Sequence, residues 1–425
     1  MFFRKKITIK KIKAREILDS RSEPTVEVLL ETDQGIFKAA APSGASKGKY
    51  EAHFLRDDAE RFGGKGVLKA VQNVNEVIAK SLIGESIDNQ QKIDELLIEI
   101  DGTPNKSLLG VNAILPVSMA VCRAGAAFWG LQLFEYLREI NNNFFGLKSN
   151  EHHLPLPCFN VIEGGVHGGG FLDIQEFMIV PTNAANFKEA LRFGSELYQM
   201  LKKSLAEKYG KTSTNLGDEG GFSPPFKKTF DVLDFLFSVI YQRTEEGGFH
   251  FALDCAASQF YKDGFYNFEG SRLTFEELFS FYALLVKKYP IIFLEDPFFE
   301  DDFDGFRKIR KELGGQIVVV GDDLLGTNFK RIQLAQEQNL CNGAIIKMDQ
   351  AGTIWETLKA VKLCRDFHWK VIISHRSGET NDDFIADLAV GVGADFIKAG
   401  SPARGERVAK YNRLLEIENF IKKTV

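Results

Sequence analysis

The sequence contains few of the features that indicate secretion, a redox site or binding to nucleic acid. Its five cysteines are spread over 425 residues without a CxxC pair, which indicates a reducing compartment in which the thiols act as small core residues. A net charge of -5 and a pI near 5.9 do not indicate a basic surface of the kind that binds nucleic acid. The basic start, residues 1–13, lacks the apolar segment and cleavage site of a secretory signal. We therefore expect a cytoplasmic protein that does not bind nucleic acid.

The chain also lacks an apolar run that is long enough to span a membrane. The most apolar stretch, residues 113–129, contains Ser118 and Arg123 and predicts a buried helix, so we expect no membrane insertion. Apolar residues make up 44% and charged residues 26%, which is typical of a globular protein. Because 425 residues exceed one ordinary core, two domains are expected.

Residues 1–140 predict an α+β domain that caps the second domain. Three strand-like runs come first and three segments with helical periodicity follow: 7–18, 25–31 and 36–41, then 67–79, 89–100 and 112–129. Between the two groups lies a Gly/Ser-rich loop that contains Ser46 and is expected to be flexible. Residues 141–157 are rich in Asn and Pro and predict a linker, in which nothing completes a metal site for His152 and His153.

Residues 158–425 predict an eight-stranded β/α barrel. Two strand-like runs, 158–162 and 174–180, have no helix between them, and two helices follow at 187–209 and 226–243. Short apolar runs that end in a polar residue then alternate with helix-like sequence, at 251–254, 291–295, 317–322, 344–347, 371–375 and 396–398. The fold class is therefore α/β with the order ββαα(βα)₆, and the side chains that do chemistry are expected where strands end.

Three acidic residues, Asp254, Glu295 and Asp322, end successive strands of the predicted barrel. They can converge above it, and three carboxylates without a thiolate form a hard oxygen site that suits Mg²⁺ or Mn²⁺. Each one alone is equally well explained as a helix cap or a solvated loop acid. Burying all three without a cation is unfavourable, however, which favours a metal site. Their neighbours Asp296 and Asp323 are expected to point the other way.

Two lysines and a polar tripeptide end the remaining strands. Lys347 and Lys398 would be surrounded by protein, and a desolvated lysine near cations has a lowered pKa and acts as a general base. Either lysine alone is better explained as an ion-paired or snorkelling side chain. The consecutive residues His375, Arg376 and Ser377 together suit a phosphate or a carboxylate.

Two Gly-rich segments add an acid and a histidine. Glu219 lies in residues 215–221 and His167 in residues 162–170. Neither segment fits a dinucleotide or P-loop fingerprint, and each by itself is as typical of a lid or a simple turn. With the strand ends they supply ligands for a divalent ion, cationic groups for a small anionic substrate, and an acid and a base. The residues alone therefore indicate metal-assisted proton abstraction next to a carboxylate, with loss of a leaving group.

Short stretches in the same order resemble the enolase family over nearly the whole chain, and ββαα(βα)₆ is also the order of that family. They are AREILDSR (14–21), PSGAS (42–46), DGTPNK (101–106), DIQEFM (173–178), GDEGG (217–221), LDCA (253–256), LEDPF (294–298), GDDL (321–324), SHRSGET (374–380) and PAR (402–404). The resemblance implies a glycolytic hydro-lyase that converts 2-phosphoglycerate reversibly into phosphoenolpyruvate. It also implies Mg²⁺ as cofactor and a homodimer.

The resemblance further implies which residues hold the metal. Asp254, Glu295 and Asp322 would bind the first Mg²⁺, which contacts the substrate carboxylate. Ser46 would join a second Mg²⁺ that arrives with the substrate and bridges to its phosphate. Two ions would thus act in each active site, as in enolase-superfamily sites, where a lysine or histidine base works with Mg²⁺.

The remaining roles also come from the resemblance. Lys347 would take the proton from C2, and Glu219, supported by Glu176, would protonate the departing C3 hydroxyl. Glu295 and Asp322 would face the substrate as well as the metal. The other substrate-binding side chains would hold the phosphate, hold the carboxylate or line the pocket: Arg376 and Ser377, then Lys398, then His167 and His375.

The chain departs from the usual family pattern in a few places. Lys47 replaces a small residue and Glu163 replaces an asparagine, which alters the charge of the two loops expected to close over the substrate. The other differences are RSEP at 21–24, Gln259, Asp349 and Asn381. Two alternatives stay open. One is another superfamily dehydratase, which the Ser46 loop argues against, and the other is a non-catalytic binding protein on the same fold.

Overall fold

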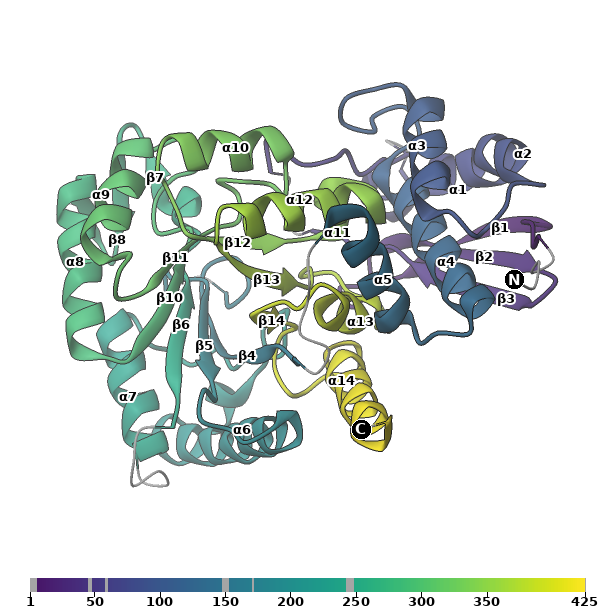
Figure 1. The fold of residues 1–425 in the computed structure, drawn as a ribbon. Helices are drawn as coiled ribbons and strands as arrows, with labels where there is room; N and C mark the ends of the chain where they lie inside the picture. Colours follow the sequence, from purple (N-terminus) through teal and green to yellow (C-terminus); the bar gives the residue numbers. More distant parts are fainter. Residues whose placement is uncertain are drawn as a thin grey trace.

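A computed structural model describes residues 6–44, 48–57, 60–146, 153–169, 172–241 and 248–424 of the chain. A three-stranded sheet with helices precedes a closed eight-stranded barrel that is surrounded by helices (Figure 1). The barrel elements follow the order ββαα(βα)₆, so the predicted fold class is confirmed.

The N-terminal sheet is antiparallel, in the order β1 (Lys11–Leu18), β2 (Pro24–Thr32) and β3 (Gly35–Ala40). The central strand, β2, pairs Val28 with Ala14 on one side and with Ala39 on the other. Helix α4 (Val111–Trp129) packs against β2 and β3. It is the one helix in the described residues that is long and apolar enough to span a membrane, and 89% of its most apolar window is buried inside the protein. The prediction of a buried helix at 113–129 is confirmed.

Short helices complete this half of the molecule. They are α1 (Leu68–Gln72), α2 (Ala79–Leu82), α3 (Gln90–Asp101) and α5 (Leu133–Phe145), with a π-helical segment at Asn73–Ile78 and a 3-10 turn at Arg61–Gly64. Helix α5 extends into the stretch that the sequence predicts as a linker. The predicted linker also contains two histidines, of which His152 lies outside the described residues and His153 is exposed.

The barrel closes in the order β4-β5-β6-β10-β11-β12-β13-β14. These strands are β4 (Leu156–Glu163), β5 (Glu176–Val180), β6 (His250–Asp254), β10 (Ile291–Glu295), β11 (Val318–Gly321), β12 (Gly343–Ile346), β13 (Lys370–Ser374) and β14 (Phe396–Lys398). Strand β5 is antiparallel to β4 and β6, because no crossover helix joins it to β4. Its first residue, Glu176, therefore pairs with Glu163 and Asp254 at the ends of those strands.

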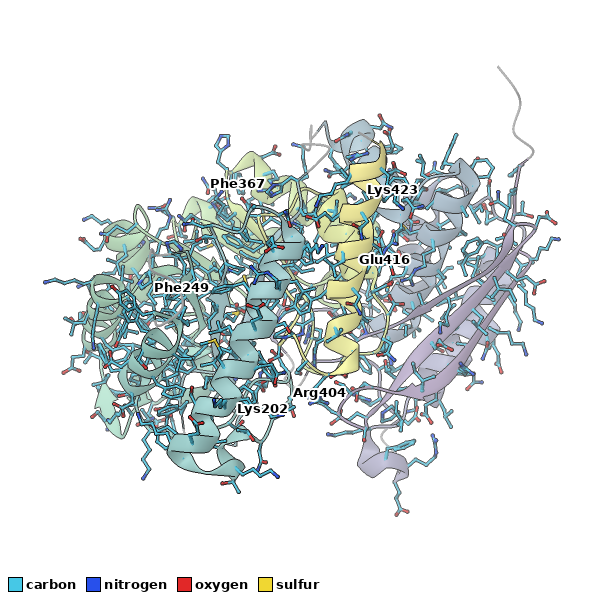
Figure 2. All side chains as sticks on the ribbon, turned by 90° about the horizontal axis from the view of Figure 1, so that it is seen from below. Lys202, Phe249, Phe367, Arg404, Glu416 and Lys423 are labelled. Carbon is cyan, nitrogen blue, oxygen red and sulfur yellow. The ribbon has the colours of Figure 1, made fainter. Side chains whose placement is uncertain are left out.

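Helices surround the barrel: α6 (Phe187–Tyr209), α7 (Thr229–Tyr241), α8 (Phe275–Lys288), α9 (Phe303–Leu313), α10 (Phe329–Glu337), α11 (Met348–Ala351), α12 (Ile354–Asp366), α13 (Phe384–Gly391) and α14 (Gly405–Thr424). Figure 2 shows α14 beside α6, the helix that carries Lys202. Below the strand ends the barrel is filled by buried side chains, namely Cys158, Met178, Val180, Ala252, Phe293, Val320, Ile345, Ile372 and Phe396. The barrel is thus a packed core that is open to chemistry only at its rim.

One element was not expected from the sequence. A small antiparallel sheet, formed by β7 (Tyr261–Lys262), β8 (Phe265–Phe268) and β9 (Ser271–Leu273), lies between β6 and α8. Its strands are too short to give a periodic pattern in the sequence. The sheet lengthens the loop that follows Asp254.

The two halves of the chain are joined by buried polar contacts at the start of α12. Asp94 accepts a hydrogen bond from the Trp355 backbone N–H at 2.8 Å, and the Ser118 hydroxyl accepts one from Ile354 at 3.0 Å. Both side chains are buried. They satisfy N–H groups that a helix start leaves without an intrahelical partner. The first half is therefore held in a fixed position over the barrel.

Candidate active site

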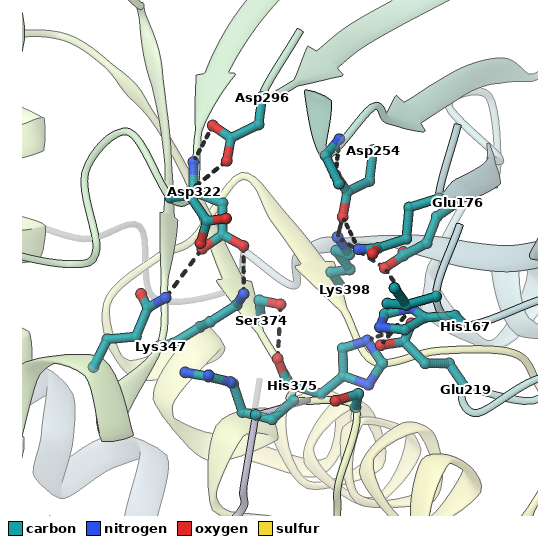
Figure 3. A pocket seen from close by; sticks show the side chains of 18 of the residues that line it. His167, Glu176, Glu219, Asp254, Asp296, Asp322, Lys347, Ser374, His375 and Lys398 are labelled. Carbon is teal, nitrogen blue, oxygen red and sulfur yellow. Dashed lines mark hydrogen bonds and ion pairs between the residues drawn. The ribbon is translucent and has the colours of Figure 1, made fainter. Parts of the chain in front are cut away.

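The strand ends of the barrel form one charged rim. Its residues either end a strand or follow it directly: Asp254 (β6), Glu295 (β10), Asp322 (β11), Lys347 (β12), Ser374 (β13) and Lys398 (β14). Most of them line a single cavity together with His167, Glu176, Glu219 and His375 (Figure 3). Since β5 runs in the opposite direction, Glu176 reaches this rim from the start of its strand.

The Lys398 ammonium lies among three carboxylates. Its Nζ is 3.0 Å from Asp254 Oδ2, 2.8 Å from Glu295 Oε2 and 3.3 Å from Glu176 Oε1. Burial lowers the pKa of Lys398, but the three carboxylates raise it well above its ordinary value. Burial raises the pKa values of Glu295 and Glu176 well above theirs, and the neighbouring carboxylates add to this. Two of the predicted metal ligands, Asp254 and Glu295, therefore converge on one point.

Asp322 and Lys347 form a second pair, with Lys347 Nζ 2.5 Å from Asp322 Oδ2. Burial lowers the pKa of Lys347, whereas the Asp322 and Glu295 carboxylates raise it, and the net direction is upward. The expectation of a lowered lysine pKa is wrong for this arrangement, because the nearest charge is an anion. Burial raises the pKa of Asp322, whereas Lys347 lowers it, and its net direction is downward.

Asp296 and Asp323 also line the cavity, so the expectation that they point away from it is wrong. The Asp296 backbone has a φ of 40°, which ends the alternation of strand β10. Its carboxylate accepts hydrogen bonds from the backbone N–H groups of Asp322, at 2.9 Å, and Asp323, at 2.6 Å. Burial and the Asp322 charge raise the pKa of Asp323 to about 7. Asp296 thus fixes the turn that places Asp322 at the rim.

The donor set at the rim fits a hard divalent cation. Asp254, Glu295 and Asp322 come from the adjacent strands β6, β10 and β11 and offer carboxylate oxygens only. The charges of Asp254 and Asp322 both raise the pKa of Glu295, a repulsion that a cation would relieve. Among the described residues, the ligand atoms that lie within 4.8 Å of one another belong to two other groups: Asp296, Asp322 and Asp323, and His167, Glu176 and Glu219. Asp322 is the one predicted ligand in these groups, so the structure does not bring Asp254 and Glu295 to the same distance from it. Ser46, predicted to join a second ion, lies outside the described residues.

Glu219 lies between two histidines. His375 Nε2 is 3.2 Å from Glu219 Oε2, and His167 Nδ1 is 3.7 Å from Glu219 Oε1. Burial lowers the pKa of His375 to about 4, so the imidazole is uncharged at neutral pH. Because Arg407 can only donate to His375 Nδ1, at 2.6 Å, the single imidazole proton is on Nε2 and faces Glu219. Burial raises the pKa of Glu219, whereas His375, His167 and Arg407 lower it, and the net direction is downward.

Glu163 is buried and accepts hydrogen bonds from the loop that carries Glu219; it does not lie in an exposed loop. It is 1% exposed at the end of β4, and its Oε1 accepts hydrogen bonds from the backbone N–H groups of Gly221, at 2.5 Å, and Glu219, at 3.2 Å. A Cβ on Gly217 would lie 2.1 Å from Glu163 Oε2, so this close approach requires glycine. Burial and the Glu219 charge raise the pKa of Glu163 well above its ordinary value. The sequence predicts that Glu163 alters the charge of a loop that closes over the substrate. In the structure Glu163 instead lies beneath the Glu219 loop.

Arg376 lies on the other side of the cavity, between two acids. Its Nη1 is 2.9 Å from Glu51 Oε2 and 2.9 Å from Asp349 Oδ2. Ser377, predicted beside it as a phosphate ligand, is buried. Sequence reasoning missed Glu51, because it comes from the first half of the chain, 325 positions before Arg376. No local pattern marks such a contact.

An eight-stranded barrel with acids, lysines and an uncharged imidazole at one rim defines a β/α-barrel enzyme of the acid–base type. Family models for the enolase N-terminal domain and the enolase C-terminal TIM barrel domain match residues 9–137 and 151–425. The chain belongs to the enolase family. It is accordingly an enzyme of the hydro-lyase class, a phosphopyruvate hydratase.

Three curated relatives are similar to this chain over nearly its whole length. "Enolase" of Methanocaldococcus jannaschii is 50% identical over 411 residues, which cover 96% of this chain and 95% of that protein. "Enolase 1" of Entamoeba histolytica is 47% identical and covers 97% and 96%, and "Enolase B" of Dictyostelium discoideum is 47% identical and covers 98% and 96%. Nothing in these similarities favours another superfamily dehydratase or a non-catalytic protein.

Proposed function

We propose that the protein catalyses the reversible, Mg²⁺-dependent dehydration of 2-phosphoglycerate to phosphoenolpyruvate in glycolysis. The observation that carries this proposal is the convergence of Asp254, Glu295, Asp322, Lys347 and Lys398 at one barrel rim, opposite Glu219. Such a set offers cation ligands, a base and an acid around a space for one small anion. The family of the chain supplies the substrate.

In this proposal Asp254, Glu295 and Asp322 would hold one Mg²⁺, and Ser46 would contribute to a second that is bound together with the substrate. Bound Mg²⁺ would supply positive charge at these carboxylates, which stabilises charge on the substrate carboxylate and offsets the effect of Asp322 on the Lys347 pKa. Lys398 binds the substrate carboxylate. The contacts of Lys398 Nζ with three carboxylates support a charged ammonium group at this position.

Proton transfer is assigned to two sides of the cavity. Lys347 removes the proton from C2. Glu219 delivers a proton to the departing C3 hydroxyl, with Glu176 as its neighbouring carboxyl. Burial and the Glu219 charge raise the pKa of Glu176 well above its ordinary value, which favours a shared proton in this cluster, and His167 Nδ1 lies 3.9 Å from Glu176 Oε1 and 3.7 Å from Glu219 Oε1. His375 is uncharged at neutral pH and therefore adds no charge to the cluster of Glu219, Glu176 and His167.

Arg376 and Ser377 bind the phosphate, since a guanidinium beside a hydroxyl matches its oxygens. His167 and His375 line the space between the two ends. The proposal also includes a division of the chain into a capping domain (1–140), a linker (141–157) and a barrel domain (158–425). A homodimer in the cytoplasm completes it.

Turnover by the purified protein tests the proposal. With Mg²⁺ and 2-phosphoglycerate we expect phosphoenolpyruvate to form. EDTA should stop the reaction because the carboxylate ligands lose their cation, and added Mg²⁺ should restore it. A chelator-treated sample whose thermal unfolding is unchanged controls for loss of structure. Absence of turnover by correctly folded, Mg²⁺-loaded protein would contradict the proposal.

A further inference from the structure

The contacts of Arg376 are unusual for a group that must receive an anion. One nitrogen, Nη1, lies 2.9 Å from both Glu51 Oε2 and Asp349 Oδ2. The three side chains are 8%, 9% and 7% exposed, respectively, so solvent screens these charges weakly. Two carboxylates from two different parts of the fold therefore share one guanidinium nitrogen.

Asp349 is the less well satisfied of the two acids. It lies in the first turn of α11, two residues after Lys347, and its Oδ1 is buried without a hydrogen-bond partner among the described residues. Glu51 Oε1, in contrast, accepts a hydrogen bond from the Gly48 backbone N–H. An ionised oxygen without a donor is unfavourable when buried. Arg376 is therefore the group that does most to stabilise the Asp349 charge at this position.

We propose that Asp349 sets the affinity of the site for the phosphate end of the substrate by competing with it for Arg376. A doubly charged phosphate that reaches Arg376 meets the Asp349 carboxylate at the same nitrogen and is repelled by it. Asp349 acts through Arg376 and is therefore a positioning residue. The inference rests on the proposed function, in which Arg376 binds phosphate.

The competition should depend on pH. Burial raises the pKa of Asp349 to about 6, Arg376 and Lys347 lower it, and Glu51 raises it. The cavity beside Asp349 is also lined by the charged or titratable residues Lys49, His53 and Arg56. Above pH 6 Asp349 is ionised and repels the anion, and below pH 6 it is protonated and the repulsion disappears. Anion affinity should therefore rise as the pH falls through 6.

The test is Asp349→Asn, which keeps the shape and an oxygen acceptor but removes the charge. At pH 8 we expect the KM for 2-phosphoglycerate to fall about tenfold, as for removal of one close like charge, while kcat stays within about twofold. At pH 5 wild type and variant should have the same KM. Asp304→Asn, at a carboxyl that is 76% exposed on α9, is the matched control and should leave KM unchanged.

Direct binding separates this inference from the proposed function. Inorganic sulfate keeps its double charge between pH 5 and 8. Any pH dependence of its affinity, measured by calorimetry, therefore comes from protonation of the protein and not of the anion. We expect wild type to bind sulfate more tightly at pH 5 than at pH 8, and Asp349→Asn to bind it equally at both. Absence of turnover by wild type would overturn the proposed function. Turnover with an unchanged or raised KM for Asp349→Asn, or an equal pH effect on sulfate binding in both proteins, would overturn the role of Asp349.

Discussion

The packed interior of the barrel and its rim use the same strands for opposite purposes. Phe293 and Glu295 are two residues apart on β10, and both are 0% exposed. Phe293 packs among apolar side chains, where burial of an aromatic ring contributes about 1.5–3 kcal/mol. The Glu295 carboxylate is paired with Lys398 Nζ at 2.8 Å, and burial raises the pKa of Glu295 well above its ordinary value. Equal burial thus stabilises the fold below the rim and creates reactive groups at the rim.

Removal of the base should give the largest effect and should separate the two regions. For Lys347→Ala we expect turnover to fall by at least about 10³-fold, because a general base contributes up to about 10⁴-fold. Exchange of the C2 proton with solvent should be lost, while calorimetry should still detect substrate binding. Lys203→Ala, at a lysine that is 79% exposed on α6, is the control and should behave as wild type. Retained C2 exchange would remove Lys347 as the base.

A cavity in the packed interior should lower the stability of the protein and leave its activity nearly unchanged. Phe293→Ala is expected to lower the free energy of unfolding by about 3–5 kcal/mol, because a large buried side chain is lost. Urea unfolding measures this change. Since Phe293 does not line the active-site cavity, KM and kcat measured well below the unfolding temperature should stay near wild type. A large loss of kcat in the folded variant would show that the two regions are not separate.

A smaller effect should come from Glu163, which ends β4 beneath the Glu219 loop and does not line the cavity. In Glu163→Gln one carboxylate oxygen becomes an NH2 group, which cannot accept the Glu219 N–H that Oε2 accepts at 3.2 Å, while the other oxygen can still accept the Gly221 N–H. We expect kcat to fall about tenfold with little change in KM, because a hydrogen bond to a charged group is worth about 1.5 kcal/mol, and the acid limb of the kcat–pH profile to shift. Glu312→Gln, at a residue on α9 far along the chain from this site, is a charge-matched control. An unchanged kcat and pH profile would leave Glu163 without a positioning role.

Much of this arrangement could be predicted because the barrel repeats one simple pattern. A short apolar run that ends in Asp254, Glu295 or Lys398 marks both a buried strand and its chemical end, so local sequence places the residue at the rim. The missing helix between β4 and β5 is equally visible. It reverses β5 and brings Glu176 to the same edge.

The remaining features depend on contacts that no local pattern records. Asp296 turns into the cavity through a backbone φ of 40°, a conformation that the sequence does not indicate for an aspartate before proline. Glu51 meets Arg376 from 325 positions away. The direction of the Lys347 pKa shift depends on which charge lies nearest, and that charge is Asp322. Long-range geometry therefore decides the protonation states, whereas sequence decides which groups are present.

The five buried cysteines have a practical consequence. All are free and buried, and burial raises the pKa of every thiol. A native chain whose thiols are shielded and protonated reacts slowly with maleimides and iodoacetamide. A single cysteine introduced on the surface would then carry a fluorophore or spin label without any background substitution. Lys49, 61% exposed beside Asp301, is a suitable attachment point for a label at a contact between the first half of the chain and the barrel.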